Sequence, residues 1–267
     1  MSVAVSIRKR LSRAFLLEVE FETGKKGEGV SGCLGILGPS GAGKSMTLKC
    51  IAGIETPDEG RIEVNGRVLF DSAKKINLKP QVRRAGYLFQ NYALFPAMTA
   101  LENIAAALPL PKKERTAKAM EWSERFGLGG CERLRPGKLS GGEQQRTALA
   151  RMLAREPEII LLDEPFSALD SGLRERMQLQ FLELLASRGD AILVTHSRDE
   201  VYKLCGEILV MEGGRVLRQD ETGELFKNPR SVAAARITGC KNISPVRRVG
   251  DREIFAVDWG LRLKTAV

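Results

Sequence analysis

The most constraining feature of the sequence is a glycine-rich stretch, residues 38–45, with the spacing G-x-x-x-x-G-K-[ST]. An apolar run, Cys33–Leu37, precedes it and a helix-compatible run, Met46–Ala52, follows it, which predicts a strand, a loop and a helix. Small residues let successive backbone N–H groups converge on one point, and the helix adds the positive end of its dipole. This context favours a phosphate-binding loop over a glycine-rich turn with an incidental Lys-Ser pair.

The chemistry expected of this loop assigns two side chains. Lys44 would reach the β- and γ-phosphates of a nucleotide, and the hydroxyl of Ser45 would bind Mg²⁺. The residues expected to surround the phosphates are Gly38, Pro39, Ser40, Gly41, Ala42, Gly43, Lys44 and Ser45.

Length and composition limit the class of protein. A chain of 267 residues with 43% hydrophobic residues can bury a substantial core, and none of its apolar runs approaches the roughly 20 residues that cross a bilayer. Arg8, Lys9, Arg10 and Arg13 interrupt the N-terminus before any long apolar region, so we expect no secretory signal and a cytosolic chain. The net charge of +9 is spread along the chain, which favours a solvated surface over a site for nucleic acid or for an anionic membrane. Five scattered cysteines without a C-x-x-C pair predict reduced, mostly buried thiols.

The first third of the chain reads as strands and turns. Val3–Ile7 and Phe15–Phe21 have strand patterns, and residues 24–32 form a Gly/Lys turn. Asn65-Gly66 lies between two short apolar runs, which is a strong hairpin signal, and Ala85–Phe89 is a further strand.

The rest alternates helices with apolar strands. Residues 101–134 are helical in pattern, broken at Pro109 and Pro111, and a long helix follows at 143–154. The other expected elements are strands at 159–162 and 191–194, helices at 173–187 and 199–204, a hairpin at 208–219, and a C-terminal hairpin from 254–257 and 261–263. This alternation predicts an α/β fold with a mainly parallel sheet.

Two carboxylates end the apolar strand Ile159–Leu162. Asp163 comes at the carboxyl end of a core strand and would hold Mg²⁺ directly or through water. Glu164 should point differently and could polarise an attacking water as general base. A pair of solvated acids is the alternative, which the phosphate loop in the same chain disfavours.

Residues 139–146, Leu-Ser-Gly-Gly-Glu-Gln-Gln-Arg, form a second turn that opens onto a helix. Unpaired N–H groups at its start would suit phosphate, yet one nucleotide has no need of two such cradles in one chain. Two copies arranged head-to-tail would let Ser140 of each clamp the γ-phosphate held by Lys44 of the other.

At this point the chain resembles the ATP-binding subunits of ABC transporters, over roughly residues 1–240. Residues 38–45 resemble the Walker A loop, Ile160–Asp163 the Walker B strand, and Glu164 the catalytic glutamate. The resemblance implies a P-loop NTPase ABC cassette, with a mainly parallel sheet, an N-terminal antiparallel β subdomain and a helical subdomain near residues 91–156.

The same resemblance implies further site residues. Ser140, Gly141, Gly142 and Gln144 correspond to the family signature, Ser167-Ala168-Leu169-Asp170 to the D-loop, Gln90 to the glutamine that senses Mg²⁺ and water, and His196, the single histidine, to the switch histidine. Phe15 is the best match for an aromatic residue that stacks on adenine, although a core Phe is an equally simple interpretation. ATP and Mg²⁺ are the implied ligands.

Residues 65–96 are similar to the ATPases of molybdate importers, with sulfate, tungstate and other oxyanion importers close behind. We expect the cassette to cover residues 1–238 and residues 239–267 to be a short C-terminal extension, too short for a complete oxyanion-binding β-barrel. Alternatives are an importer ATPase for iron, polyamine or sugar, or a non-transport ABC ATPase that acts on nucleic acid or ribosomes. The last lacks support because no long coiled coil or second cassette is present, and an ABC protein without turnover is disfavoured by Glu164 and His196.

The expected partners follow from the resemblance. They are a second copy of the chain, two membrane-spanning permease subunits and, indirectly, an extracytoplasmic substrate-binding protein, with the chain peripheral at the cytoplasmic face of the membrane. No nucleic acid is expected. The apolar stretch Asn91–Met98 would receive the membrane subunit, with a packed core loop as the alternative.

Overall fold

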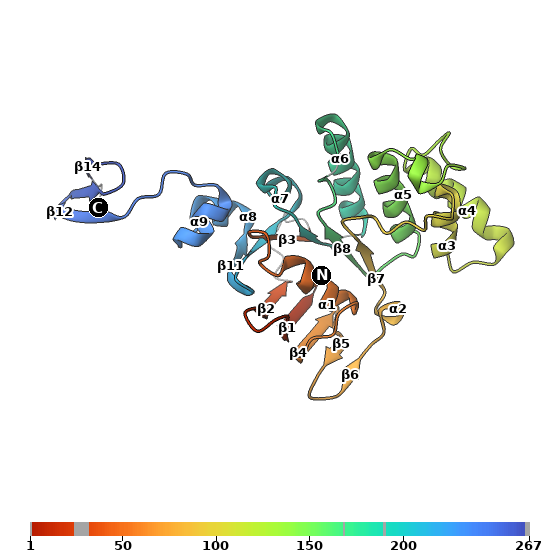
Figure 1. Ribbon diagram of the computed structural model, residues 1–267, viewed down its shortest axis with the longest axis horizontal. Coiled ribbons are helices and arrows are strands. Elements are labelled where there is room, and N and C mark those ends of the chain that lie inside the picture. Colours follow the sequence, from red (N-terminus) through yellow and green to blue (C-terminus); the bar gives the residue numbers. More distant parts are fainter. Residues whose placement is uncertain (1, 24–31, 168, 189–190, 265–267) are drawn as a thin grey trace.

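The computed structural model describes residues 2–23, 32–167, 169–188 and 191–264. Its centre is one mixed sheet in the order β6-β5-β4-β1-β2-β11-β10-β3-β9-β8-β7. The sheet has an antiparallel half and a largely parallel half, with helices packed against it (Figure 1). The expected α/β fold with an N-terminal antiparallel part is therefore confirmed.

The antiparallel half forms because its strands alternate apolar and polar residues. In β1 the buried residues Val3, Val5 and Ile7 alternate with more exposed ones, so one face of the strand enters the core. The predicted Asn65-Gly66 hairpin is confirmed, since both residues have positive φ (50° and 78°), as a tight hairpin turn requires. The strands of this half are β1 (Val3–Arg10), β2 (Leu16–Thr23), β4 (Glu59–Val64), β5 (Arg67–Asp71) and β6 (Ile76–Asn77).

The parallel half is buried on both faces. In β8 (Ile159–Asp163) every residue is buried, with Ile159 and Leu161 in one core cluster and Ile160 and Leu162 in the other. The other strands of this half are β3 (Cys33–Leu37), β7 (Ala85–Leu88), β9 (Ala191–Val194) and β10 (Glu207–Glu212), and β10 pairs with β11 (Arg215–Glu221) as predicted. Because β10, β3, β9, β8 and β7 are parallel, their carboxyl ends meet at one edge of the sheet.

The helices follow the predicted pattern with few departures. The helical stretch after residue 100 divides into α3 (Ala100–Ala107) and α4 (Lys112–Arg125), on either side of the two prolines, and these pack with α5 (Gly141–Leu153) at one end of the molecule (Figure 1). The remaining predicted helices are α1 (Lys44–Ala52), α6 (Ser171–Arg188) and α7 (Arg198–Leu204). Four short helices were not predicted, because each is too short to show a helical repeat of apolar residues. They are α2 (Pro80–Arg83), η1 (Pro136–Lys138), α8 (Thr222–Lys227) and α9 (Val232–Thr238). None of the described helices is long and apolar enough to span a membrane.

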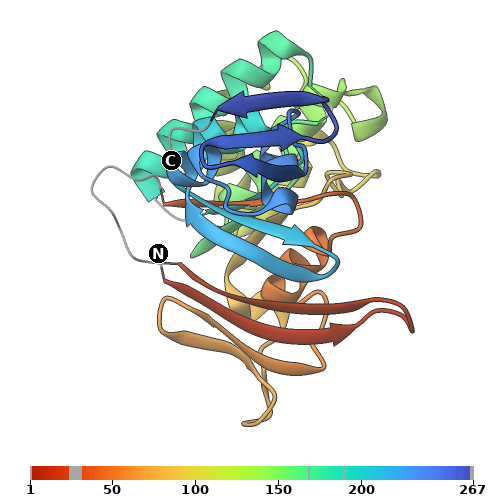
Figure 2. The same cartoon turned by 90° about the vertical axis from the view of Figure 1, so that its left-hand side faces the viewer.

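A separate small sheet follows the last helix. Gly239 ends α9 in the left-handed conformation (φ 108°), and residues 240–245 lead to β12 (Val246–Gly250), β13 (Glu253–Ala256) and β14 (Leu261–Lys264). The predicted hairpin at 254–263 is confirmed, while β12 was missed because Arg247-Arg248 interrupts its apolar pattern. This sheet stands apart at one end of the molecule and faces the viewer in Figure 2.

Four of the cysteines are buried thiols and Cys240 is exposed.

Candidate nucleotide-binding site

A cleft of about 530 Å³ opens at the edge where the parallel strands end. The loop after β3 lines it, and the segments after β7, β8 and β9 contribute Gln90, Glu164 with Ser167, and His196. Its lining residues are Leu11, Phe15, Ser40, Gly41, Ala42, Gly43, Lys44, Ser45, Met46, Gln90, Glu164, Ser167 and His196. Seven of the predicted phosphate-loop and catalytic side chains, far apart in sequence, therefore share one cavity with the loop glycines.

The loop needs its glycines for two physical reasons. A Cβ on Gly38 would lie 2.2 Å from the carbonyl oxygen of Met211, and a Cβ on Gly43 would lie 2.5 Å from Leu17 Cδ1. Gly43 also has φ 98° at the start of α1, a conformation that other residues rarely adopt. The backbone can thus approach a ligand closely, as a phosphate cradle requires.

Lys44 lies across the loop that it would serve. Its Nζ donates to the carbonyl oxygens of Gly38 (2.8 Å) and Pro39 (2.9 Å). Burial lowers the pKa of Lys44, while the carboxylates of Glu164 and Asp163 oppose that shift. A cation in this position fits the negative charge of phosphates.

Asp163 is held through both carboxylate oxygens. Ser45 Oγ donates to Oδ1 at 2.7 Å and the hydroxyl of Tyr87 donates to Oδ2 at 3.0 Å. Burial, and then the charge and hydrogen bond of Asp163, raise the pKa of Tyr87, so its phenol stays a donor at neutral pH. The oxygens of Ser45 and Asp163 are the hard donors that Mg²⁺ prefers, so the pair fits that ion. Bound there, Mg²⁺ would neutralise phosphate charge.

Glu164 turns away from Asp163, as expected, and meets the histidine. It has φ 53° and donates its backbone N–H to Val194 O at 2.9 Å, which anchors the end of β8 to β9. Its Oε2 lies 2.8 Å from Nδ1 of His196. The carboxylate is 15% exposed and the imidazole 73% exposed, so the acid is sheltered and the histidine faces the cleft.

Gln90 and Phe15 also line the cleft. Gln90 is exposed two residues after the end of β7. Phe15 is partly buried against the core, and its ring edge lies 3.7 Å from the position of a Cβ on Gly43. The ring of Phe15 thus packs on the core and also lines the cleft, and its stacking on adenine stays a prediction.

The signature residues lie elsewhere in the chain. The described lining of the cleft does not include Ser140, Gly141, Gly142, Gln144 or Asp170, and Ala168 lies outside the described residues. The sequence suggested unpaired N–H groups at the start of α5. The structure differs, because Ser140 and Glu143 form a reciprocal capping box there. Gln144 Nε2 donates to the carbonyls of Pro136 and Leu139, and Asp170 accepts from the backbone N–H of Leu173.

Two supporting groups escaped the sequence analysis. The sequence pattern assigns Tyr87 only to a strand, although a Tyr in a buried strand needs a partner for its hydroxyl, and that need is the signal that could have found it. Thr195 accepts from the backbone N–H of Ser197 (3.0 Å) and donates to Glu200 (2.6 Å). Burial raises the pKa of Glu200. This buried pair supports the turn that carries His196.

Fold and cleft together define a P-loop nucleotide-binding cassette. The sequence profile of the family described as "ABC transporter" matches residues 30–167, about half of the chain. The chain belongs to the ABC transporter family.

Curated relatives share most of this chain. An Fe(3+) ions import ATP-binding protein of Rhizobium etli is 41% identical over 219 residues, which are 80% of this chain and 60% of the relative. A sulfate/thiosulfate import ATP-binding protein of Chromobacterium violaceum is 40% identical, covering 86% of this chain and 61% of the relative. A molybdate/tungstate import ATP-binding protein of Thermococcus kodakarensis is 43% identical, covering 78% and 62%. The chain thus spans about three fifths of the length of these relatives.

A solved structure agrees with the fold. The dimeric, post-hydrolysis state of the ATP-binding cassette MJ0796 bound to ADP and Pi superposes with a TM-score of 0.68 at 28% identity. The match covers 83% of this chain and 99% of that one. The unmatched part of this chain has no counterpart in that cassette.

Proposed function

We propose that this protein is the ATP-hydrolysing subunit of an ABC importer. The observation that carries the proposal is the meeting of Lys44, Asp163, Glu164 and His196 around one cleft beside a glycine-rich loop. A cation for phosphate, a carboxylate with a hydroxyl for Mg²⁺ and a second carboxylate for water are the groups that phosphoryl transfer to water needs.

Each side chain has a proposed task. Lys44 binds the β- and γ-phosphates of ATP, and Ser45, Asp163 and Gln90 hold Mg²⁺. Glu164 accepts a proton from the attacking water, and His196, 2.8 Å away, orients that carboxylate and faces the γ-phosphate. Phe15 offers its ring to the adenine.

The second half of the site comes from a second copy of the chain. Ser140 and Gly141 are exposed at the start of α5 and do not line their own cleft, which supports a role towards another chain's nucleotide. The superposed cassette is itself described as dimeric. In a head-to-tail pair, Ser140, Gly141, Gly142 and Gln144 would close on the γ-phosphate, with Asp170 at the seam.

The membrane partners would dock at a groove of about 680 Å³ between β7, α3 and α5. Phe95, 48% exposed, lies on its wall with the guanidinium of Arg151 5.2 Å above its ring, and the groove also includes Arg84 and Arg155. Gln90 lines the nucleotide cleft, and its neighbour in the sequence, Phe89, lines this groove. This proximity supports transmission of ATP binding to two permease subunits. A substrate-binding protein would act on the other side of the membrane, and the cassette would be peripheral on the cytoplasmic face.

The cargo we propose is molybdate or a related oxyanion. The support is the sequence similarity to a molybdate/tungstate import ATP-binding protein, although equally similar relatives are named for iron and for sulfate or thiosulfate. The division into a cassette of residues 1–238 and an extension of residues 239–267 is part of the same proposal.

One experiment tests function and cargo together. The chain is assembled with its permeases and binding protein in vesicles, and uptake of labelled molybdate is measured with ATP inside. Competition by tungstate and sulfate, but not by ferric ion or maltose, is expected. ATP-dependent uptake of labelled ferric ion but not of labelled molybdate would replace the oxyanion with iron, and ATP turnover without uptake of molybdate, sulfate or ferric ion would contradict the importer.

A further inference from the structure

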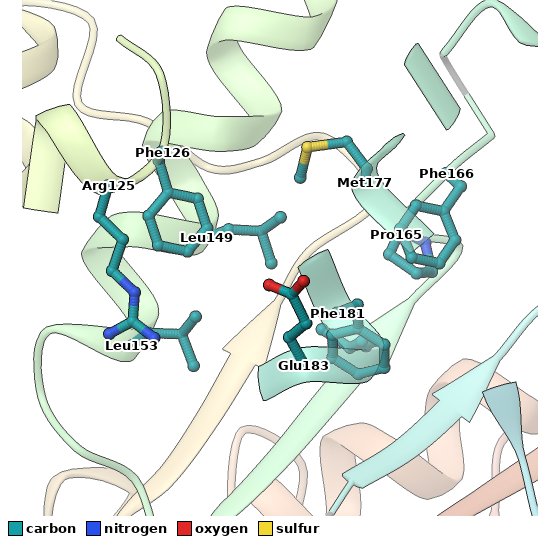
Figure 3. A pocket seen from close by; sticks show the side chains of 10 residues that line it. Arg125, Phe126, Leu149, Leu153, Pro165, Phe166, Met177, Phe181 and Glu183 are labelled. Carbon is teal, nitrogen blue, oxygen red and sulfur yellow. The ribbon is translucent and has the colours of Figure 1, made fainter. Parts of the chain in front are cut away.

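An apolar cavity lies beside the segment that follows β8 and is lined by other residues than the nucleotide cleft. Its volume is about 260 Å³, and its walls come from the end of α4, from α5 and from α6, with the segment just after Glu164 between them (Figure 3). It shares no described lining residue with the nucleotide cleft. The proposed function makes no use of it.

The interior of this cavity is apolar and sheltered. Leu153, Leu162 and Phe166 are each 1% exposed, and Met177 and Phe181 are 3% and 5% exposed. Native interiors leave few voids larger than a water molecule, and apolar cavities stay dry and bind apolar molecules. Since a cavity of about 150 Å³ accepts benzene, this one has room for a ligand of about ten non-hydrogen atoms.

The mouth of the cavity carries two opposite charges. Arg125, at the end of α4, and Glu183, on α6, are the exposed members of the lining, and the Glu183 carboxylate extends between Leu149 and Phe181 (Figure 3). Among the described side chains, Glu183 has no ion-pair partner, and Arg125 has none either, its guanidinium lying over the ring of Trp122 (5.2 Å). One cation and one anion at the rim match a zwitterion better than a ligand with a single charge, which one of the two would repel.

We propose that this cavity binds a free α-amino acid with a large apolar side chain. The side chain enters the apolar interior beside Phe166 and Met177, the ammonium pairs with Glu183, and the carboxylate pairs with Arg125. Pro165 and Phe166 follow directly after Glu164, so the bound ligand contacts the segment that carries the proposed catalytic base.

Binding is measured directly, without reference to ATP hydrolysis, so that its outcome is separate from that of the proposed function. L-Phenylalanine, glycine and toluene are titrated against the full chain by ligand-observed NMR, with a thermal-shift series alongside. A ligand of this size should saturate with a dissociation constant of about 1 mM or below. Glycine, which has only the charged head, and toluene, which has only the ring, should each bind at least roughly tenfold more weakly, because each lacks one set of contacts.

Matched variants assign the binding to this cavity. Glu183→Gln should weaken the binding of L-phenylalanine several-fold. Glu175→Gln changes an exposed acid on the same helix that does not line the cavity, so it should have no effect. Met177→Trp, or the milder Leu149→Phe, should fill the cavity and abolish binding. Leu179→Trp on the exposed face of α6 (57% exposed) should not.

Three results would overturn the proposal. They are no saturable binding of L-phenylalanine up to about 20 mM, binding that survives in the folded Leu149→Phe variant, and toluene binding equal to that of L-phenylalanine with no response to Glu183→Gln. The last would leave an apolar cavity with no amino-acid specificity.

Discussion

The carboxylate of Glu164 and the imidazole of His196 meet at 2.8 Å, although they follow different strands of the sheet. β8 and β9 are parallel neighbours, so the residues after them are brought to the same edge. The left-handed backbone of Glu164 (φ 53°) and its bond to Val194 O turn its side chain towards the histidine. This pair is the centre of the proposed reaction.

Replacement of Glu164 by Gln should separate ATP binding from hydrolysis. The change keeps shape and hydrogen bonding but removes the base, so phosphate release should fall at least about 10²-fold while ATP still binds and the closed dimer accumulates. Phosphate release and size-exclusion chromatography with ATP are the measurements. Glu212→Gln, at an exposed acid outside the cleft, is the control. Near-normal turnover in the Glu164 variant would remove this residue from the mechanism.

Replacement of Lys44 by Ala should weaken the binding of the nucleotide itself. The variant removes the charge that faces the β- and γ-phosphates, so the affinity for Mg·ATP should fall at least about tenfold. Equilibrium titration with a fluorescent ATP analogue checks this. Lys49→Ala, on the same helix but outside the cleft lining, should bind as the wild type does. Equal affinities for the two variants would contradict the phosphate-loop assignment.

Replacement of Tyr87 by Phe should weaken the binding of the metal ion more than that of the nucleotide. The variant removes the donor to Asp163 Oδ2 and leaves the ring in place, so the carboxylate loses one of its two fixed contacts. We expect the Mg²⁺ concentration for half-maximal ATPase to rise several-fold, by roughly the value of one hydrogen bond to a charged group, with metal-free ATP affinity unchanged. Mn²⁺ binding followed by EPR gives a second readout, and Tyr202→Phe, at an exposed tyrosine, is the control. Unaltered Mn²⁺ affinity would show that Tyr87 only packs.

Mixing two defective variants should restore one working site. In a head-to-tail pair, a Ser140→Arg chain combined with a Lys44→Ala chain gives one intact composite site and one site that carries both defects. Homodimers of either variant contain no intact site. ATP-dependent dimer closure should therefore be higher in the mixture than in either variant alone, as measured by light scattering. A mixture no better than its components would exclude this arrangement.

Replacement of Phe95 by Asp should uncouple the chain from its membrane partners. Leu94 packs against the core, so only the exposed Phe95 is changed. A carboxylate in place of the exposed ring should abolish co-purification with the permeases and transport, while ATPase of the isolated chain stays within about twofold of wild type. Val232→Asp, at a residue 54% exposed on α9, is the control. Wild-type yields of the complex with the Phe95 variant would move the docking surface elsewhere.

The local sequence pattern was sufficient to predict a feature wherever the residues that form it are neighbours in the sequence. Residues 38–45 were predictable because a phosphate loop is made by consecutive N–H groups and by glycines where a Cβ would clash. The buried strands β3, β8 and β9 were predictable because short apolar runs can bury both faces only inside a parallel sheet. β12 was not predictable, since its arginines mask the alternation.

The sequence by itself therefore determined the α/β class, the phosphate loop and the identity of the side chains available for chemistry. Only the tertiary structure decided which of them meet. Residues 44, 87, 163, 164 and 196 come together because β3, β9, β8 and β7 are neighbours, and strand order depends on packing between distant segments. The Tyr87–Asp163 bond, the turn of Glu164 towards His196 and the empty space beside Phe166 have no local sequence signal, because each depends on contacts across elements far apart in the chain.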